Sequence, residues 1–287
     1  VMYKALDLAI KKQEEVLGEY VIRDKSYSNY MANAIWEIFL QDMKDNYPNA
    51  YNSYKNGGGG ELKEGRYPPK MASFGSSSRF IYNLSKDIPG FQFEKQFHTH
   101  VGGKSNLDGF FDSIDCCTCI EAKCREPYYH TSHFGEKRKN VYYNLLKFIT
   151  DQNIGLQFDC TETEDNEISI KTYSDDLPIE YFDIIQLVCH FCGIANKLLR
   201  NEINKNVRFI YLIYNPTELP ETCFKKGMKE KIVNRYNLTL NQMNSIDMNE
   251  LFKTILNYFD PEKKTQYNFE FIKSDQNDFI DLLNKGR

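Results

Sequence analysis

The fold of this chain is decided by the stretch Asn106-Leu-Asp-Gly-Phe-Phe-Asp-Ser113, which is followed after two residues by Cys116-Cys-Thr-Cys-Ile-Glu-Ala-Lys123. Both runs are mostly apolar, and only a short turn separates them. They predict two strands, over residues 107–113 and 117–123, that are joined as a β-hairpin.

The hairpin carries polar residues at one end. Asp108 stands near the start of the first strand, and Glu121-Ala122-Lys123 closes the second. Because side chains alternate between the two faces of a strand, Glu121 and Lys123 share a face and Ala122 points away. The hairpin therefore brings two carboxylates and an ammonium group to one end of a sheet.

The flanking segments alternate between helical and extended patterns. Residues 48–70, with their glycine run and Pro68-Pro69, predict a flexible loop, and the residues after 214 are predicted to be mostly helical. Apolar residues recur at helical spacing over residues 2–20, 27–45, 71–87, 135–152 and 179–201. Further strands are predicted over residues 91–99, 155–160, 167–173 and 207–214.

The last of these strands identifies the fold class. Residues 207–214 are almost continuously apolar, which is typical of a strand buried on both faces. A strand that is reached through a helix, here 179–201, pairs in parallel with its neighbour. The sequence therefore predicts an α/β fold with a mixed central sheet flanked by helices.

Composition limits the function. The chain has 287 residues and a formal net charge of −4, so it has no global basic field for a nucleic acid, and any basic surface must be local. No apolar run approaches the ~20 residues that span a bilayer, and the N-terminus lacks a signal-peptide pattern. The cysteines fit reduced, buried thiols better than a zinc site. These features predict a cytoplasmic protein with no membrane partner.

The carboxylates and the lysine suggest phosphodiester chemistry. Mg²⁺ prefers one or two carboxylates together with waters and phosphate oxygens, and Asp108 and Glu121 supply that ligand type. The carbonyl oxygen of Ala122 is a further candidate ligand, and Mn²⁺ is expected to substitute. Lys123 can orient the attacking water, stabilise charge on the phosphate, or act as a base.

The alternative is that Glu-x-Lys, a common pattern, marks only a solvated strand face. Three observations favour a functional site over a solvated strand face. Glu121 closes an apolar strand, Asp108 begins the preceding one, and the order of elements is β-β-β-α-β.

Asp108 and Glu121-Ala122-Lys123, in this order of elements, resemble the PD-(D/E)xK nuclease superfamily, which has the restriction-endonuclease-like fold. Leu107 stands where the family usually has proline. The run Glu121-Ala-Lys-Cys-Arg-Glu-Pro-Tyr128 and the Ser77-Ser78…Asn83 helix resemble a bacterial branch of restriction endonucleases. The resemblance implies that Asp108 and Glu121 bind metal and that Lys123 assists the water.

The resemblance also implies an organisation for the whole chain. It covers roughly residues 72–217, with an αβββαβ core. Residues 1–70 would be an N-terminal helical extension, residues 218–287 a C-terminal helical extension, and residues 1–287 a single nuclease domain.

Further site residues follow from the same resemblance. Gln186 matches the glutamine that members often carry on the helix after the hairpin, where it would bond the Glu or the metal-bound water. The alternative is a polar position on a mostly buried helix. Glu37 and Glu94 are candidates for an additional acidic residue, unless they are surface carboxylates.

Basic residues near the hairpin are candidates for phosphate or DNA contacts, because arginine suits bidentate phosphate binding. Surface salt bridges are the alternative for each. The candidates are Lys95, Arg125, Lys137, Arg138 and Lys139.

The sequence therefore predicts a Mg²⁺-dependent DNA endonuclease of the restriction or defence type, in a bacterium. A homodimer is expected, since cutting both strands needs two sites or two visits, and a cognate methyltransferase is a possible partner. Two alternatives stay open. One is a structure-specific repair or RNA-cutting nuclease on the same fold, and the other is a catalytically silent nucleic-acid-binding module.

Overall fold

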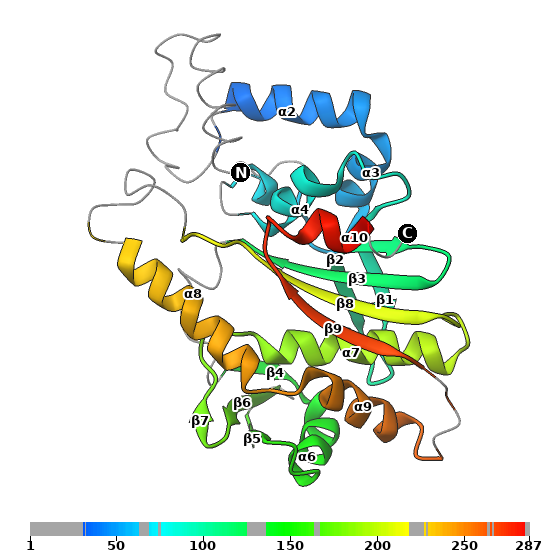
Figure 1. Ribbon diagram of the computed structural model, residues 1–287, viewed down its shortest axis with the longest axis vertical. Helices are drawn as coiled ribbons and strands as arrows, with labels where there is room; N and C mark the ends of the chain where they lie inside the picture. Colours follow the sequence, from blue (N-terminus) through cyan, green and yellow to red (C-terminus); the bar gives the residue numbers. More distant parts are fainter. Residues whose placement is uncertain are drawn as a thin grey trace.

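The computed structural model describes residues 31, 33–62, 69–73, 76–124, 136–163, 167–217, 227, 229–262, 265 and 267–284. Its centre is a mixed five-stranded sheet in the order β1-β2-β3-β8-β9 (Figure 1). The strands are β1 (Gln92–His98), β2 (Lys104–Asp112), β3 (Cys116–Lys123), β8 (Asn206–Ile213) and β9 (Phe269–Ser274). The first three are antiparallel, whereas β3–β8 and β8–β9 are parallel. The predicted α/β class, the hairpin and the parallel pairing of 207–214 are confirmed.

Helices cover both faces of this sheet (Figure 1). On one face, an aromatic core that includes Tyr54, Phe80 and Phe279 lies beneath α2 (Asn33–Asn46), α3 (Pro48–Asn56), α4 (Ser77–Ser85) and α10 (Phe279–Asn284). On the other, Phe191, Phe209 and Phe252 pack beneath α7 (Ile184–Leu199), α8 (Lys229–Asn244) and α9 (Met248–Phe259). Burying both faces is what allows β3 and β8 to be almost continuously apolar.

A smaller sheet is inserted between β3 and α7. It has the order β4-β6-β5, and the short β7 pairs with β6. Phe158, Ile168 and Ile170 turn one of its faces into the core shared with α7. The predicted hairpin over 155–160 and 167–173 is confirmed. The elements are β4 (Glu136–Lys139), β5 (Leu156–Glu162), β6 (Glu167–Ser174), β7 (Leu177–Pro178), η2 (Asn140–Tyr142) and α6 (Tyr143–Asp151).

Three predicted helices are shorter than their patterns, and the one predicted over 179–201 spans only Ile184–Leu199 as α7. The helix predicted over 135–152 begins only at Tyr143, because residues 136–139 pair with β6 as strand β4. The helix predicted over 71–87 is preceded by the short η1 (Lys70–Ala72) and spans 77–85. Its start is fixed by Ser76, whose side chain accepts a hydrogen bond from the Arg79 N–H.

Two further predictions were wrong in part. The flexible loop over 48–70 contains α3, which begins at Pro48 and buries Ala50 and Tyr54 on one side. Proline suits the first turn of a helix because its missing N–H would have no helical partner there. The C-terminal segment is not only helical, because residues 269–274 form β9 and complete the central sheet. The predicted helix over 27–45 corresponds to α2, and the one over 2–20 lies outside the described residues.

Among the described residues, no helix has both the length and the apolar composition needed to cross a bilayer. The described cysteines are free thiols, and most of them are buried.

Candidate active site

Three carboxylates form a row across neighbouring strands. Continuing the β1–β2 register sets Glu94 opposite Asp108. Continuing the β2–β3 register by one pair beyond Gly109 and Ile120 sets Asp108 opposite Glu121. The row lies near the end of β3, which is where the hairpin was predicted to gather its polar groups.

The strands are irregular at this row. The β2–β3 ladder ends at Gly109, and the next N–H of β3, that of Ala122, donates a 2.8 Å hydrogen bond to Asp108 Oδ2. Glu94 has a φ of 51°, a left-handed conformation that is uncommon for a residue with a side chain. Such backbone irregularities often mark functional sites, because they turn side chains out of the regular alternation.

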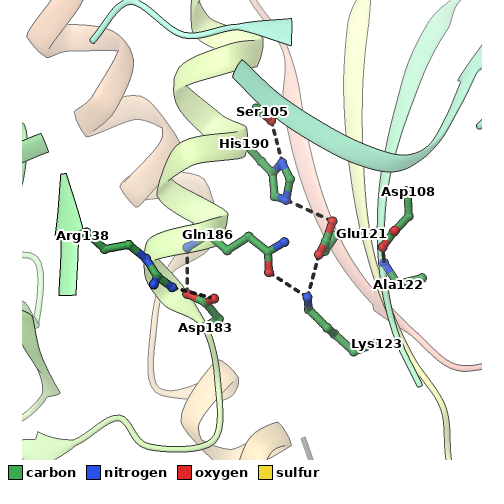
Figure 2. A network of polar contacts seen from close by, with 9 residues as sticks. All are labelled: Ser105, Asp108, Glu121, Ala122, Lys123, Arg138, Asp183, Gln186 and His190. Carbon is green, nitrogen blue, oxygen red and sulfur yellow. Dashed lines mark hydrogen bonds and ion pairs between the residues drawn. The ribbon is translucent and has the colours of Figure 1, made fainter. Parts of the chain in front are cut away.

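Glu121 and Lys123 meet on one face of β3, as the alternation predicts. Lys123 Nζ lies 2.8 Å from Glu121 Oε1, and both side chains are largely buried, with exposures of 12% and 3%. The same Nζ donates a 2.7 Å hydrogen bond to Gln186 Oε1 on α7 (Figure 2). The structure thus brings Gln186 to the site, but its partner is the lysine rather than the glutamate.

A histidine of α7 approaches the second oxygen of Glu121. His190 Nε2 lies 3.0 Å from Glu121 Oε2, close enough for an ion pair but without the geometry of a hydrogen bond. The other ring nitrogen, Nδ1, lies 2.6 Å from Ser105 Oγ on β2. Both oxygens of Glu121 therefore have a nitrogen beside them.

The N-terminus of α7 is fixed by an aspartate. Asp183 accepts a 2.9 Å hydrogen bond from the Gln186 N–H, and its other oxygen lies 3.2 Å from Arg138 Nη2 on β4. The network in Figure 2 thus runs from the inserted sheet, through α7, to β3. Arg138 lies in this network, and its guanidinium forms an ion pair.

The opposite end of the row is more acidic. The glycine run packs against β1 so closely that a Cβ at Gly59 would lie 3.0 Å from Glu61 Oε1 and 3.2 Å from Glu94 Oε2. Lys70 Nζ lies 3.8 Å from Glu61 Oε1 and bonds the carbonyl of Gly59. A fourth carboxylate, Glu61, therefore lies beside Glu94 at this end of the row.

The pKa values differ along the row. Burial alone would raise the pKa of Glu121, but Lys123 and His190 hold it well below its usual range. Burial and then Glu121 raise the pKa of Asp108, although Lys123 opposes this. Burial, Glu61 and Glu121 raise the pKa of Glu94 to about 7. Negative charge is thus well compensated at Glu121 and poorly compensated at the other two.

The remaining predicted residues are less close to the row or are not described. Glu37 is exposed on α2, the outermost helix on the α4 face of the sheet, and is not brought to the row (Figure 1). Lys95 Nζ bonds Gln92 Oε1 and lies over the Phe110 ring. Arg125 lies outside the described residues, as do the side chains of Lys137 and Lys139 on β4.

The donor set suits a hard cation, but it is not assembled around one. Asp108, Glu94 and Glu121 offer carboxylate oxygens, the ligands that Mg²⁺ prefers, and their mutual repulsion would be relieved by a cation. Within the described parts of the chain, no three His, Cys, Asp or Glu side chains are arranged to hold a metal ion. Lys123 and His190 lie beside the oxygens of Glu121, so binding would require some of these groups to move.

Sequence reasoning missed His190, Ser105 and Glu61. His190 follows Gln186 by four residues, which places both on one helix face, so this spacing was an available signal. Ser105 and Glu61 carried no such signal, because Ser105 precedes the strand predicted over residues 107–113 and Glu61 follows the glycine run.

No model of a known protein family matches this chain, and neither curated proteins nor solved structures match it.

Proposed function

We propose that this protein is a metal-dependent endonuclease that hydrolyses DNA phosphodiester bonds. The observation that carries the proposal is the row Glu94, Asp108 and Glu121, with Lys123 Nζ 2.8 Å from Glu121. Buried carboxylates that repel one another, beside a lysine, are costly to stability and are typical of sites that bind cations.

Asp108 and Glu121 would hold Mg²⁺, with Glu94 as an additional carboxylate and the carbonyl oxygen of Ala122 as a further donor. When bound, the ion supplies a Lewis acid for the phosphate and lowers the pKa of a water. The raised pKa values of Asp108 and Glu94 support this assignment, because a cation favours the ionised form of both.

Lys123 is the residue that would act on the phosphate. Its ammonium group can stabilise the negative charge that develops on the phosphate oxygens, or orient the attacking water. Gln186, 2.7 Å away, holds the ammonium toward Glu121. Water attacks the phosphorus as the bond to the 3′ oxygen breaks, which leaves a 5′-phosphate and a 3′-hydroxyl.

The order α4, β1, β2, β3, α7, β8 supports a restriction-endonuclease-like αβββαβ core, interrupted here by the small inserted sheet. On this reading the protein is a PD-(D/E)xK nuclease of the restriction or defence type. Duplex DNA is the proposed substrate, and a homodimer and a cognate methyltransferase are proposed with it.

The test is cleavage of plasmid and phage DNA with Mg²⁺ or Mn²⁺ by the wild type, Lys123→Ala and Lys205→Ala. Lys205 is a matched control, because its Nζ lies 2.8 Å from Asp112 Oδ1, at the opposite end of the hairpin strands. Lys123→Ala should lower the rate by about 100-fold or more, and Lys205→Ala should leave it unchanged.

Equal loss in both variants would mean that stability, not chemistry, is being measured. Cleavage only of RNA or of branched DNA would favour a toxin or repair nuclease on the same fold. An intact protein that cuts nothing and binds no Mg²⁺ by calorimetry would reject the proposal in favour of a silent binding module.

A further inference from the structure

Helix α7 lies close to β1 and β2 at one point. Gly193 has no side chain there, and an added Cβ would lie 2.9 Å from Phe97 Cβ and 3.2 Å from Ser105 Cβ. One turn earlier, His190 Nδ1 reaches Ser105 Oγ at 2.6 Å, and one turn later Asn196 Nδ2 bonds the carbonyl of His98 at 2.8 Å. The close approach at Gly193 is therefore what lets His190 contact Ser105.

The ring of His190 lies between that serine and the glutamate of the site. Figure 2 shows the imidazole between Ser105 and Glu121. Its Nε2 lies 3.0 Å from Glu121 Oε2. All three residues are about 98–99% buried, since their exposures are 1%, 2% and 2%. A buried carboxylate needs partners for both of its oxygens, and here one faces Lys123 and the other faces His190.

The order serine, histidine, carboxylate is also that of a hydrolase triad. Ser105 is 1% exposed, so its hydroxyl cannot reach a substrate as a nucleophile would. Its contact with His190 therefore orients the imidazole ring instead.

We propose that Ser105 and His190 are positioning residues that hold the carboxylate of Glu121 in the orientation needed for metal binding. This inference rests on the proposed nuclease function. Ser105 fixes the ring at Nδ1, the ring fixes Oε2 of Glu121, and Lys123 is left to hold Oε1. Partners of this kind behind metal ligands typically change metal affinity by about 10- to 100-fold when they are removed.

Two substitutions of similar size separate positioning from simple packing. The amide of glutamine reaches approximately where Nε2 of histidine lies, so His190→Gln keeps a donor toward Glu121 and loses the contact with Ser105. The shorter amide of asparagine reaches approximately where Nδ1 lies, so His190→Asn keeps the contact with Ser105 and loses the one with Glu121. His190→Ala removes both contacts, and Ser105→Ala removes only the first link.

The measurements are Mn²⁺ binding by calorimetry and the thermal midpoint of each metal-free variant. His190→Asn and His190→Ala should weaken Mn²⁺ binding by about 10- to 100-fold, and His190→Gln should retain most of it. Ser105→Ala should lie between the wild type and His190→Asn. Gly193→Ala, which pushes α7 away from β1 and β2, should also weaken Mn²⁺ binding, as Ser105→Ala does.

Equal Mn²⁺ affinity in the glutamine and asparagine variants would overturn the inference, whether both retained binding or both lost it. If the wild type itself binds no Mn²⁺, the nuclease proposal fails, and a double-mutant cycle on metal-free protein decides the positioning role. Additive losses in the free energy of unfolding for Glu121→Gln and His190→Asn would then mean that His190 does not hold Glu121 at all.

Discussion

Glu121 and the pair formed by Asp108 and Glu94 lie in one row of the sheet, yet their electrostatic surroundings are opposite. Glu121 has a nitrogen beside each oxygen, and its pKa is held low. Asp108 and Glu94 have carboxylates as near neighbours, and their pKa values are raised. Three acidic residues on adjacent strands thus differ because of what packs against them.

Helix α7 brings Gln186 and His190 to the Glu121 end, and the glycine run brings Glu61 to the Glu94 end. The row is consequently polarised, with its less compensated negative charge on β1 and β2. A cation would gain most on that side. Four predictions test this contrast.

The largest effect is expected for Glu121→Gln, which leaves Lys123 buried beside a neutral amide. The free energy of unfolding should fall by about 3–5 kcal/mol, as when one member of a buried ion pair is removed. Urea denaturation at pH 7 measures it. Glu270→Gln is the control, because Glu270 pairs with Arg208 at 3.0 Å but is 58% exposed, and its loss should cost below about 1 kcal/mol. Equal losses of unfolding free energy in Glu121→Gln and Glu270→Gln would contradict the strong compensation of the Glu121 charge.

The next effect concerns the pH dependence of stability. The pKa of Glu94 is raised from 4.5 to about 7, so the folded protein holds that proton more tightly than the unfolded chain does. Stability from this group is therefore present at low pH and is lost as pH rises from about 4.5 through about 7, by about 3 kcal/mol. Relative to wild type, Glu94→Gln should lose this decline, and saturating Mg²⁺ should reduce it in the wild type. Parallel pH profiles for the two proteins would refute the assignment.

Asp108→Asn should have the opposite sign from Glu121→Gln. It removes one of the repelling charges, and the amide oxygen can still accept the Ala122 N–H. The free energy of unfolding at pH 8 should rise by about 1–2 kcal/mol while DNA cleavage is lost, as expected where a functional residue is destabilising. A loss of stability would mean that the charge of Asp108 is compensated in the folded protein, which would contradict the contrast with Glu121.

The smallest effect compares two helix caps. Asp183 caps α7 at the site, and Asp247 caps α9 away from it. Substitution of either by alanine should cost about 1 kcal/mol in thermal or urea unfolding. Only Asp183→Ala should also lower cleavage, because Gln186 lies in the first turn that it fixes. If Asp183→Ala and Asp247→Ala cleaved DNA at the same rate, the cap of α7 would have no role in the site.

The sequence predicted the parts of the site whose spacing lies within one element. Glu121 and Lys123 share a face because they are two residues apart on a strand, and β8 is parallel because a helix precedes it. The difference in charge compensation between the two ends of the row was not predictable. It depends on which loop and which helix face pack against each strand, and those contacts join residues far apart in the chain.

The strand β9 was missed for a similar reason. Its alternating residues, Phe269 and Phe271, stack on Phe252 of α9 and Phe209 of β8, at centroid distances of 3.9 Å and 5.8 Å. A short alternating run does not indicate which strand it will pair with. Likewise β4, with its basic residues, is a strand only because β6 lies beside it.

The position of β9 has a consequence for how the chain can be divided. Residues 72–217 contain the whole carboxylate row, yet a fragment with those limits would leave the apolar strand β8 at an unprotected edge. Open apolar edges recruit strands from other molecules, so such a fragment is expected to aggregate. During synthesis the same edge stays uncovered until residues 269–274 have been made, so β9 is the strand that protects this sheet from self-association.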